Sequence, residues 1–370
     1  MKKVLTIGGA TQDIFITYTD PHMLRLYSKK TKREYLILEE GSKIEINNLS
    51  YYTGGGATNS AVSFSRLGFD VSTIFKTGND PQADQVLQKL NYEKVDTTYT
   101  KKHDTLHTGT SIIIPSLGQD RTVLAYRGSN IGLELDDINE DIIKSCDQLY
   151  ITSLSGKSSK ILPHITKLAK KHNTPVAINP GTSQLAAGAK QLRQSLKNID
   201  IFILNSSEAN TFMKTLLEID TKLKKQLKTA DTPVLKNAPE LLKSPITYQD
   251  ISFSLHNYFH LVLQRGPKIV VVTNGKEGVY VATNNTIYFH PSIKTKEVST
   301  LGAGDSFGSC FVASFLMGKN IKESIINGII NSSSVISYLD AKTGLLTRQE
   351  LEKRSKELTT AQIKTFALKN

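Results

Sequence analysis

A short glycine-rich turn followed by an acidic residue has the residue types that phosphoryl chemistry needs. Gly302-Ala303-Gly304-Asp305 precedes apolar residues at helical spacing, from Phe307 to Leu316. Free backbone N–H groups at the start of such a helix bind anions, phosphate above all. Asp305 beside them would take a proton from a hydroxyl, while the three preceding N–H groups hold the charge on a transferring phosphoryl group. The alternative is that Asp305 only complements the helix dipole.

A second glycine run lies near the N-terminus. Gly54-Gly55-Gly56 leads into small residues that predict a helix ending near Leu67-Gly68. Glycines let the backbone approach a ligand closely. Asn59, early in this helix, offers both a donor and an acceptor, which suits a sugar hydroxyl. The alternative is an ordinary turn from a strand into a helix, with Asn59 as a polar residue of its first turn.

A third acidic residue follows the first apolar run of the chain. Asp13 comes shortly after Val4-Leu5-Thr6-Ile7, which predicts a strand. Open α/β sheets bind ligands beyond the carboxyl ends of their strands. Asp13 is therefore a candidate substrate ligand, or else a solvated loop carboxylate. Gly8-Gly9-Ala10 lacks the Gly-x-Gly-x-x-Gly spacing of dinucleotide-binding enzymes, which disfavours an oxidoreductase.

Taken in order, these motifs resemble the ribokinase-like (PfkB, phosphofructokinase-B) carbohydrate and nucleoside kinases. The family signature Asp-Thr-x-Gly-Ala-Gly-Asp matches Ser299–Asp305 at six of seven places, the free one included. The Gly-Gly element with its Asn matches Gly54–Asn59, and the Asn-x-x-Glu element matches Asn205–Glu208. The nucleotide loop after a late strand looks like Val270–Gly275. Asn-x-x-Glu alone is not specific, because it is also a helix capping box.

The resemblance implies transfer of the γ-phosphoryl group of ATP to a primary alcohol of a sugar such as ribose or fructose, with Mg²⁺ bound between the phosphates. Asp305 is the implied base, and the N–H groups of Gly302, Ala303 and Gly304 stabilise the transferring group. Asn205 and Glu208 hold the magnesium ion through water. The remaining implied roles fall into two groups: Asp13, Gly55, Gly56, Asn59 and Arg127 for the substrate, and Asn205, Thr273, Gly275 and Asn331 for the nucleotide.

Two other functions stay open at this point. An adenosine kinase of the same fold shares every motif above, so spacing does not separate the two acceptors. A catalytically silent sugar or nucleotide sensor is the other alternative. The joint presence of Asp305, Glu208 and Asn59 disfavours it, because a sensor needs no base. For Arg127, the alternative role is a surface arginine at a hinge.

One departure from the family signature concerns a monovalent cation. Ser299 stands where the family usually has Asp, which in many members helps to hold an activating potassium ion. Serine keeps an oxygen ligand but removes the negative charge. Activation of this enzyme by a monovalent cation is therefore doubtful.

Apolar runs and helical periodicity alternate along most of the chain. This pattern predicts a doubly wound, mostly parallel sheet with helices on both faces. We expect strands near 3–8, 70–76, 148–153, 175–179, 200–204, 269–273, 278–282 and 286–290. We expect helices near 57–67, 81–91, 157–172, 184–196, 206–217, 250–264, 302–317, 321–338 and 347–357.

Two stretches without helices interrupt this alternation. Strands are expected at Ile14–Ile16, Tyr35–Leu38 and Lys43–Ile46, and at Gly109–Ile114 and Thr122–Tyr126 around a turn at Leu117–Asp120. The resemblance implies that they form a small β-sheet lid over the sugar, which excludes water, and a homodimer contact. The α/β kinase domain is then 1–13, 54–106 and 128–370, the lid 14–53 and 107–127, and residues 218–248 an insertion with a short helix or two.

Composition narrows the possible partners and the cellular location of the protein. The 370 residues carry a net charge of +12, which favours anionic partners, but the lysines are scattered as on solvated helix faces. Basic and aromatic residues are not interleaved, so we expect no nucleic-acid partner. The longest apolar runs are too short to span a membrane, and Gly8 interrupts the first run too soon for a signal peptide. Two cysteines, Cys146 and Cys310, suggest the cytoplasm.

Overall fold

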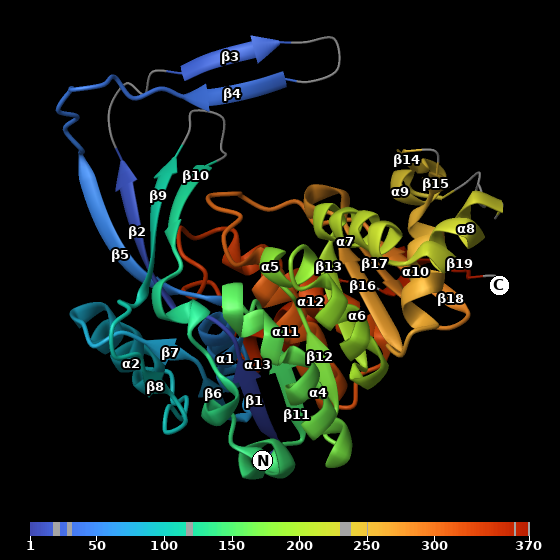
Figure 1. Ribbon diagram of the computed structural model, residues 1–370, viewed down its shortest axis with the longest axis horizontal. Helices are drawn as coiled ribbons and strands as arrows, with labels where there is room; N and C mark the ends of the chain where they lie inside the picture. The colour runs from blue at the N-terminus through green and yellow to red at the C-terminus, as the bar shows by residue number, and fades with distance from the viewer. Residues whose placement is uncertain are drawn as a thin grey trace.

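A nine-stranded sheet forms the centre of the protein (Figure 1). The computed structural model describes residues 1–17, 23–27, 32–115, 121–229, 238–249, 251–358 and 360–368. Six strands, in the order β6-β1-β11-β12-β13-β16, are parallel, and β17, β18 and β19 extend the β16 edge antiparallel. Their bounds are β1 Lys3–Ile7, β6 Asp70–Ile74, β11 Gln148–Ile151, β12 Val176–Ile178, β13 Ile201–Asn205, β16 Ile269–Thr273, β17 Val279–Ala282, β18 Thr286–His290 and β19 Lys364–Ala367.

Both faces of this sheet are covered by helices, because its strands are apolar on both sides. In β13, Phe202 and Leu204 pack into one core, while Ile201 and Ile203 pack into the other. The first core receives α3 Glu140–Ser145, α4 Leu162–Lys171, α5 Thr182–Leu185, α6 Ala189–Ser195, α7 Ser206–Ile219, α8 Thr221–Thr229, α9 Glu240–Lys243 and α10 Leu255–Leu263. The second receives α1 Gly56–Arg66, α2 Pro81–Tyr92, α11 Ala303–Leu316, α12 Ile321–Val335 and α13 Arg348–Ser355. The predicted α/β fold with helices on both faces is confirmed.

A smaller four-stranded sheet, called the lid below, stands away from the α/β body (Figure 1). Its order is β10-β9-β2-β5, with bounds β2 Thr11–Thr17, β5 Asn48–Gly54, β9 Gly109–Pro115 and β10 Arg121–Tyr126. The pairs β10–β9 and β2–β5 are antiparallel, while β2 and β9 run parallel. The hairpin β3 Met23–Tyr27 and β4 Lys32–Leu36 lies at its far end. The predicted turn at Leu117–Asp120 lies outside the described residues.

Three expected elements differ from the structure. Residues 43–46 form no strand, because β5 occupies the edge of β2 and leaves Ile44 and Ile46 exposed. The helix expected at 250–264 begins only at Leu255, because Ile251–Phe253 pairs with β14 Ile246–Tyr248 as strand β15. The helix expected at 184–196 is broken near Gly188 into α5 and α6.

The remaining regular structure is short. The insertion contains α8 and α9, as expected, and also β14, which the sequence did not reveal. Strand β19 was missed as well. The last short elements are β7 Lys76–Thr77, β8 Lys101–Lys102, and the 3-10 turns Gly128–Ile131, Leu135–Asp137, Gly156–Ile161, Leu196–Asn198, Gly275–Glu277 and Thr360–Gln362. Within the described ranges, none of these helices has the length and apolar character to cross a membrane.

Candidate active site

The turn before α11 has the geometry that the sequence predicts. Gly302 is the N-cap residue with φ of +77°, and a Cβ there would lie 2.4 Å from the Cβ of Ala341. Only glycine suits that position. Ala303 N–H donates to the carbonyl oxygen of Thr300 at 3.3 Å, which closes the turn. Gly304 and Asp305 follow in the first helical turn, where N–H groups point off the helix end.

Asp305 is held by a side chain from another helix. Asn59, in the first turn of α1, donates from Nδ2 to Asp305 Oδ2 at 2.8 Å. Burial raises the pKa of Asp305 above its ordinary value, and the nearby charge of Asp13 adds to that rise. The Asn59 hydrogen bond and the positive charge of Lys342 oppose it. A carboxylate with a raised pKa is a better proton acceptor near neutral pH.

Asp13 lies on a lid strand and not in the loop that the sequence suggests. It belongs to β2, is only 6% exposed, and accepts a hydrogen bond from Thr11 Oγ1 at 3.1 Å. Burial raises the pKa of Asp13, while Lys342 and the neighbouring hydroxyl groups oppose the rise. Asp13 is thus a partly compensated buried carboxylate near Asp305, which suits the binding of neutral hydroxyl groups.

The glycine run before α1 serves a close backbone approach. Gly55 has φ of +95°, and a Cβ there would lie 2.4 Å from the carbonyl oxygen of Gly9. Ala57 N–H donates to that same oxygen at 3.2 Å. Gly56 begins α1 directly after this contact. These glycines therefore dock α1 against the end of β1 and so place Asn59.

Asn205 and Glu208 form a capping box at the start of α7. Glu208 N–H donates to Asn205 Oδ1 at 2.8 Å, and Asn205 N–H donates to Glu208 Oε2 at 2.9 Å. Burial raises the pKa of Glu208, and the charge of Asp305 adds to the rise. Only Glu208 Oε2 accepts the Asn205 N–H, so Oε1 takes no part in that bond of the capping box. Within the described residues no three acidic, His or Cys side chains form a metal cluster, so a Mg²⁺ ion here would keep most of its waters.

A cavity of about 530 Å³ lies beside the end of β16, the turn between β16 and β17, and the start of α11. That volume is in the range of small-molecule sites. Two predicted nucleotide residues, Thr273 and Gly275, line it, and so do Ala303 and Gly304. A larger hollow of about 840 Å³ beside α9 includes none of the predicted catalytic residues. The smaller cavity is therefore the candidate nucleotide site.

Asn331 does not belong to this cavity. Its side chain is fully buried, donates to the carbonyl oxygen of Ser306 at 3.0 Å and accepts from Leu346 N–H at 3.0 Å. Its amide is engaged inside the protein and is not part of the cavity lining, which disfavours the predicted contact with the nucleotide. The neighbouring Ser332 and Ser333 line the cavity instead.

Two arginines of the lid differ in their placement. Arg127 is exposed at the point where the lid returns to the α/β body. Arg121, at the other end of β10, donates from Nη1 to Thr300 Oγ1 at 2.7 Å. The register places Arg121 on the face of the lid that carries Asp13, opposite to Leu124. Arg121 therefore connects the lid to the loop before the catalytic turn, a contact that sequence reasoning missed.

Lys342 is the second functional residue that the sequence did not reveal. Its side chain is 1% exposed and donates to Asn59 Oδ1 at 2.6 Å. It lies in Asp340-Ala-Lys-Thr-Gly344, where neither spacing nor residue type indicates burial. A lysine is almost never buried without a partner, so this one is integral to the site.

Comparisons with known proteins show the family and the fold of the chain. The family model for "pfkB family carbohydrate kinase" matches residues 22–348. The chain is 26% identical over 356 residues to a ribokinase of Staphylococcus aureus, covering 94% of this chain and 98% of that protein. Two solved structures share the fold. Ribokinase of Arabidopsis thaliana, complexed with ribose and ATP, has a TM-score of 0.70, 17% identity, and coverage of 96% of this chain and 99% of that one. For a putative ribokinase II of E. coli with ATP and Mg²⁺ the values are 0.72, 18%, 97% and 100%. The chain therefore belongs to the pfkB family of carbohydrate kinases, as the motifs predict.

Proposed function

Because the chain is a pfkB-family carbohydrate kinase, we propose that it transfers the γ-phosphoryl group of ATP to the hydroxymethyl group of a sugar such as ribose or fructose. The observation that carries the proposal is the position of Asp305. Its carboxylate accepts a hydrogen bond from Asn59 and lies near the charge of Asp13 on lid strand β2, while its neighbour Gly304 lines the same cavity as Thr273. Asp305 thus lies between polar side chains, one of them from the lid, and a nucleotide-sized cavity.

Asp305 accepts the proton of the attacking hydroxyl in this proposal. Asp13 and Asn59 bind sugar hydroxyl groups, and the lid keeps water from the phosphoryl group. The N–H groups of the Gly302–Asp305 turn stabilise the charge on the transferring oxygens, which is the main catalytic task in phosphoryl transfer. Glu208 and Asn205 would hold Mg²⁺ through water. The bound ion would neutralise part of the phosphate charge.

A coupled assay of ADP release tests this function. The acceptors are ribose, fructose, fructose phosphates, 2-keto-3-deoxygluconate and adenosine, each compared with ATP alone. We expect a sugar to raise ADP release well above ATP hydrolysis, and the product to carry its phosphate on the former hydroxymethyl group. If adenosine were the best acceptor, the proposed substrate would be a nucleoside and not a sugar. Rates that never exceed ATP hydrolysis would contradict the kinase proposal.

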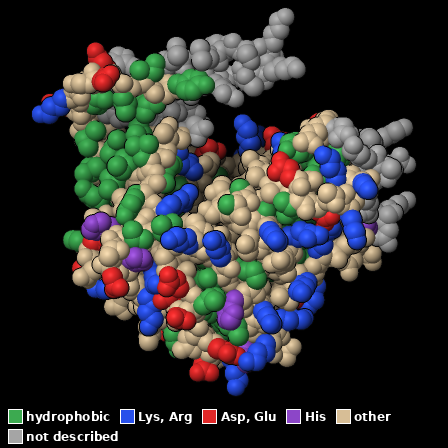
Figure 2. All heavy atoms as spheres, viewed as in Figure 1, with side chains coloured by type: hydrophobic (Ala, Val, Ile, Leu, Met, Phe, Trp, Pro, Cys, Tyr) green, Lys and Arg blue, Asp and Glu red, His purple; other side chains and the backbone are tan. Residues whose placement is uncertain are grey.

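The outer face of the lid is the feature that favours a homodimer, with a second copy of the chain as the partner. Cross-strand pairing places Tyr51, Ile14, Ile112 and Leu124 in one row, on the face opposite to Asp13. Tyr51 and Leu124 are each 53% exposed. Figure 2 shows hydrophobic side chains gathered on the lid, whereas Lys and Arg cover much of the helical body. An exposed apolar sheet face of this kind favours association. We therefore assign a homodimer contact to this face.

Light scattering on the purified protein tests the dimer. We expect Leu124→Glu to shift the protein toward the monomer. Tyr92→Glu, at a tyrosine 80% exposed on α2, serves as the control and leaves the mass unchanged. A monomeric wild type at micromolar concentration would contradict the assignment.

We also propose a cytoplasmic location, because both cysteines are buried and free.

A further inference from the structure

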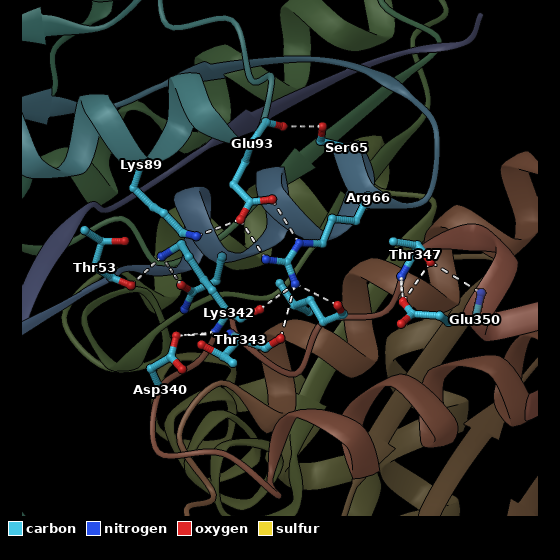
Figure 3. Close-up of polar contacts among 12 residues, drawn as sticks. Thr53, Ser65, Arg66, Lys89, Glu93, Asp340, Lys342, Thr343, Thr347 and Glu350 are labelled. Carbon is cyan, nitrogen blue, oxygen red and sulfur yellow. Dashed lines mark hydrogen bonds and ion pairs between the residues drawn. The ribbon is translucent and has the colours of Figure 1, made fainter.

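Lys342 enters the active site from the loop between α12 and α13 (Figure 3). Its ammonium group donates to the carbonyl oxygen of Thr53 at 2.6 Å, to Thr58 Oγ1 at 3.0 Å and to Asn59 Oδ1 at 2.6 Å. A lysine ammonium has three N–H donors and no acceptor. All three donors are therefore engaged, and no donor remains for a substrate group.

This contact decides how the Asn59 amide is oriented. The oxygen and nitrogen of an amide look alike, and their assignment follows from the hydrogen-bond partners. Lys342 can only donate, so the Asn59 oxygen must face it. The Asn59 N–H₂ group then faces Asp305, to which it donates at 2.8 Å. With the amide turned over, two donors would face each other and an oxygen would face the carboxylate.

The loop that carries Lys342 is itself held in place. Asp340 Oδ2 accepts the N–H of Lys342 at 3.0 Å. From α1, Arg66 Nη1 donates to the carbonyl oxygens of Lys342 at 2.9 Å and Leu345 at 2.7 Å. Glu93 fixes the other side of this guanidinium through bonds of 2.9 and 2.7 Å (Figure 3). A side chain supported in this way offers a rigid contact to Asn59.

The ammonium is also set among carboxylates from three parts of the chain. Asp13 of β2, Asp305 of α11 and Asp340 of its own loop attract the charge of Lys342, and Lys89 of α2 repels it. Burial lowers the pKa of Lys342 to about 8, while the three carboxylates oppose that change. An isolated buried ammonium would be costly, so these acidic neighbours compensate it.

We propose that Lys342 is a positioning residue for phosphoryl transfer, which fixes the Asn59 amide so that it orients Asp305 and favours its carboxylate form. This inference rests on the proposed role of Asp305 as the base. It predicts that Lys342 acts on turnover and not on ATP binding, because its three donors are engaged away from the nucleotide cavity.

Lys342→Met tests the proposal, since methionine keeps the apolar stem and removes the ammonium. We expect kcat to fall by about 10–100-fold, the effect of a small misplacement of a reacting group. The KM for ATP should change little. The acid limb of the kcat profile should move to higher pH, because the carboxylate of Asp305 loses both a donor and a positive neighbour. Lys76→Met is the matched control, because Lys76 is also largely buried and pairs with Asp137 at 2.8 Å, but it belongs to β7, outside this cluster.

Three outcomes separate the possible explanations. A cooperatively melting Lys342→Met enzyme with wild-type kcat and an unchanged acid limb would overturn the proposal. If Lys342→Met does not melt cooperatively, Lys342→Gln takes its place. We expect the same shift of the acid limb in Lys342→Gln, and wild-type behaviour of that variant would also overturn the proposal. In an Asn59→Ala background, Lys342→Met should cost little more, because the two act through one contact; additive losses would contradict the proposal. A wild-type enzyme without sugar-dependent ADP release would instead overturn the proposed function.

Discussion

On the side of the active site that we propose for phosphate, the ligand-facing groups belong to the backbone of a single turn, Gly302–Asp305, and to one capping box at Asn205 and Glu208. On the sugar side, they are side chains from separate segments: Asp13 from the lid, Asn59 from α1 and Lys342 from a loop near the C-terminus. The first side is local in sequence, and the second exists only after folding. Phosphoryl transfer is common to carbohydrate kinases, whereas the sugar acceptor differs between them, so we expect the features particular to this enzyme on the sugar side.

The largest effect should come from the one residue that both sides share. Asp305→Asn removes the base but keeps the side-chain volume and a hydrogen-bonding group. We expect kcat to fall by about 10²–10⁴-fold, the usual contribution of a general base. The KM for the sugar should change little. Steady-state kinetics on the purified variant check this, and more than half of wild-type turnover would exclude Asp305 as the base.

Two glycines of the same turn should behave differently if the backbone builds the phosphate side. Gly302→Ala forces a Cβ against Ala341 at φ of +77°, and we expect it to lower the free energy of unfolding by about 1–3 kcal/mol. Gly304→Ala meets no atom within 4 Å of its Cβ and should fold as well as the wild type. Its methyl group would instead occupy the edge of the nucleotide cavity and raise the KM for ATP.

Urea unfolding and ATP saturation curves separate these two effects. Equal loss of stability in both variants would contradict the strained turn that the structure shows. A normal KM for ATP in Gly304→Ala would remove Gly304 from the nucleotide site.

Glu208→Gln tests whether the phosphate side of the site also holds the magnesium ion. Glutamine keeps the capping box, because its oxygen still accepts the Asn205 N–H, so stability should stay near that of the wild type. Loss of the charge should raise the Mg²⁺ concentration for half-maximal rate by several-fold, since a water-mediated contact with a carboxylate is partly electrostatic. A titration of turnover with MgCl₂ at fixed ATP gives the answer. Unchanged magnesium dependence would leave Glu208 with the capping role alone.

The two sides also differ in how far the sequence predicts them. Gly302–Asp305 lies at the start of a helix as predicted, and Thr273 and Gly275 line a cavity beside it, because these positions depend on short motifs next to regular elements. Asp13 was placed in a loop because nothing in its surroundings distinguishes a short link from the start of lid strand β2. Lys342 was missed because its burial depends on acceptors nearly three hundred residues away along the chain. The burial of Asn331 was not foreseen, because a polar residue on an amphipathic helix does not reveal which way it faces.

The smallest effect concerns Ser299, the neutral residue where the family usually has Asp. In the structure Ser299 is 7% exposed, and its Oγ accepts the N–H of Leu301 at 3.2 Å, so its oxygen already serves the turn. We propose that the loop before Gly302 binds potassium weakly. Neutral oxygens alone compete poorly with the hydration shell of the ion, and a carboxylate adds about 1 kcal/mol at 4 Å in water and several-fold more when partly buried.

Exchange of sodium for potassium at constant ionic strength should therefore change turnover little. Ser299→Asp should create or strengthen a response to potassium, because about 1.4 kcal/mol of added attraction is a tenfold gain in affinity. Ser299→Asn, which is similar in size and uncharged, is the control and should leave the response as in the wild type. Turnover measured with each salt in the three proteins decides the matter. Strong activation of the wild type by low millimolar potassium would show that another group supplies the negative charge, and the individuality of this enzyme would then extend to the phosphate side as well.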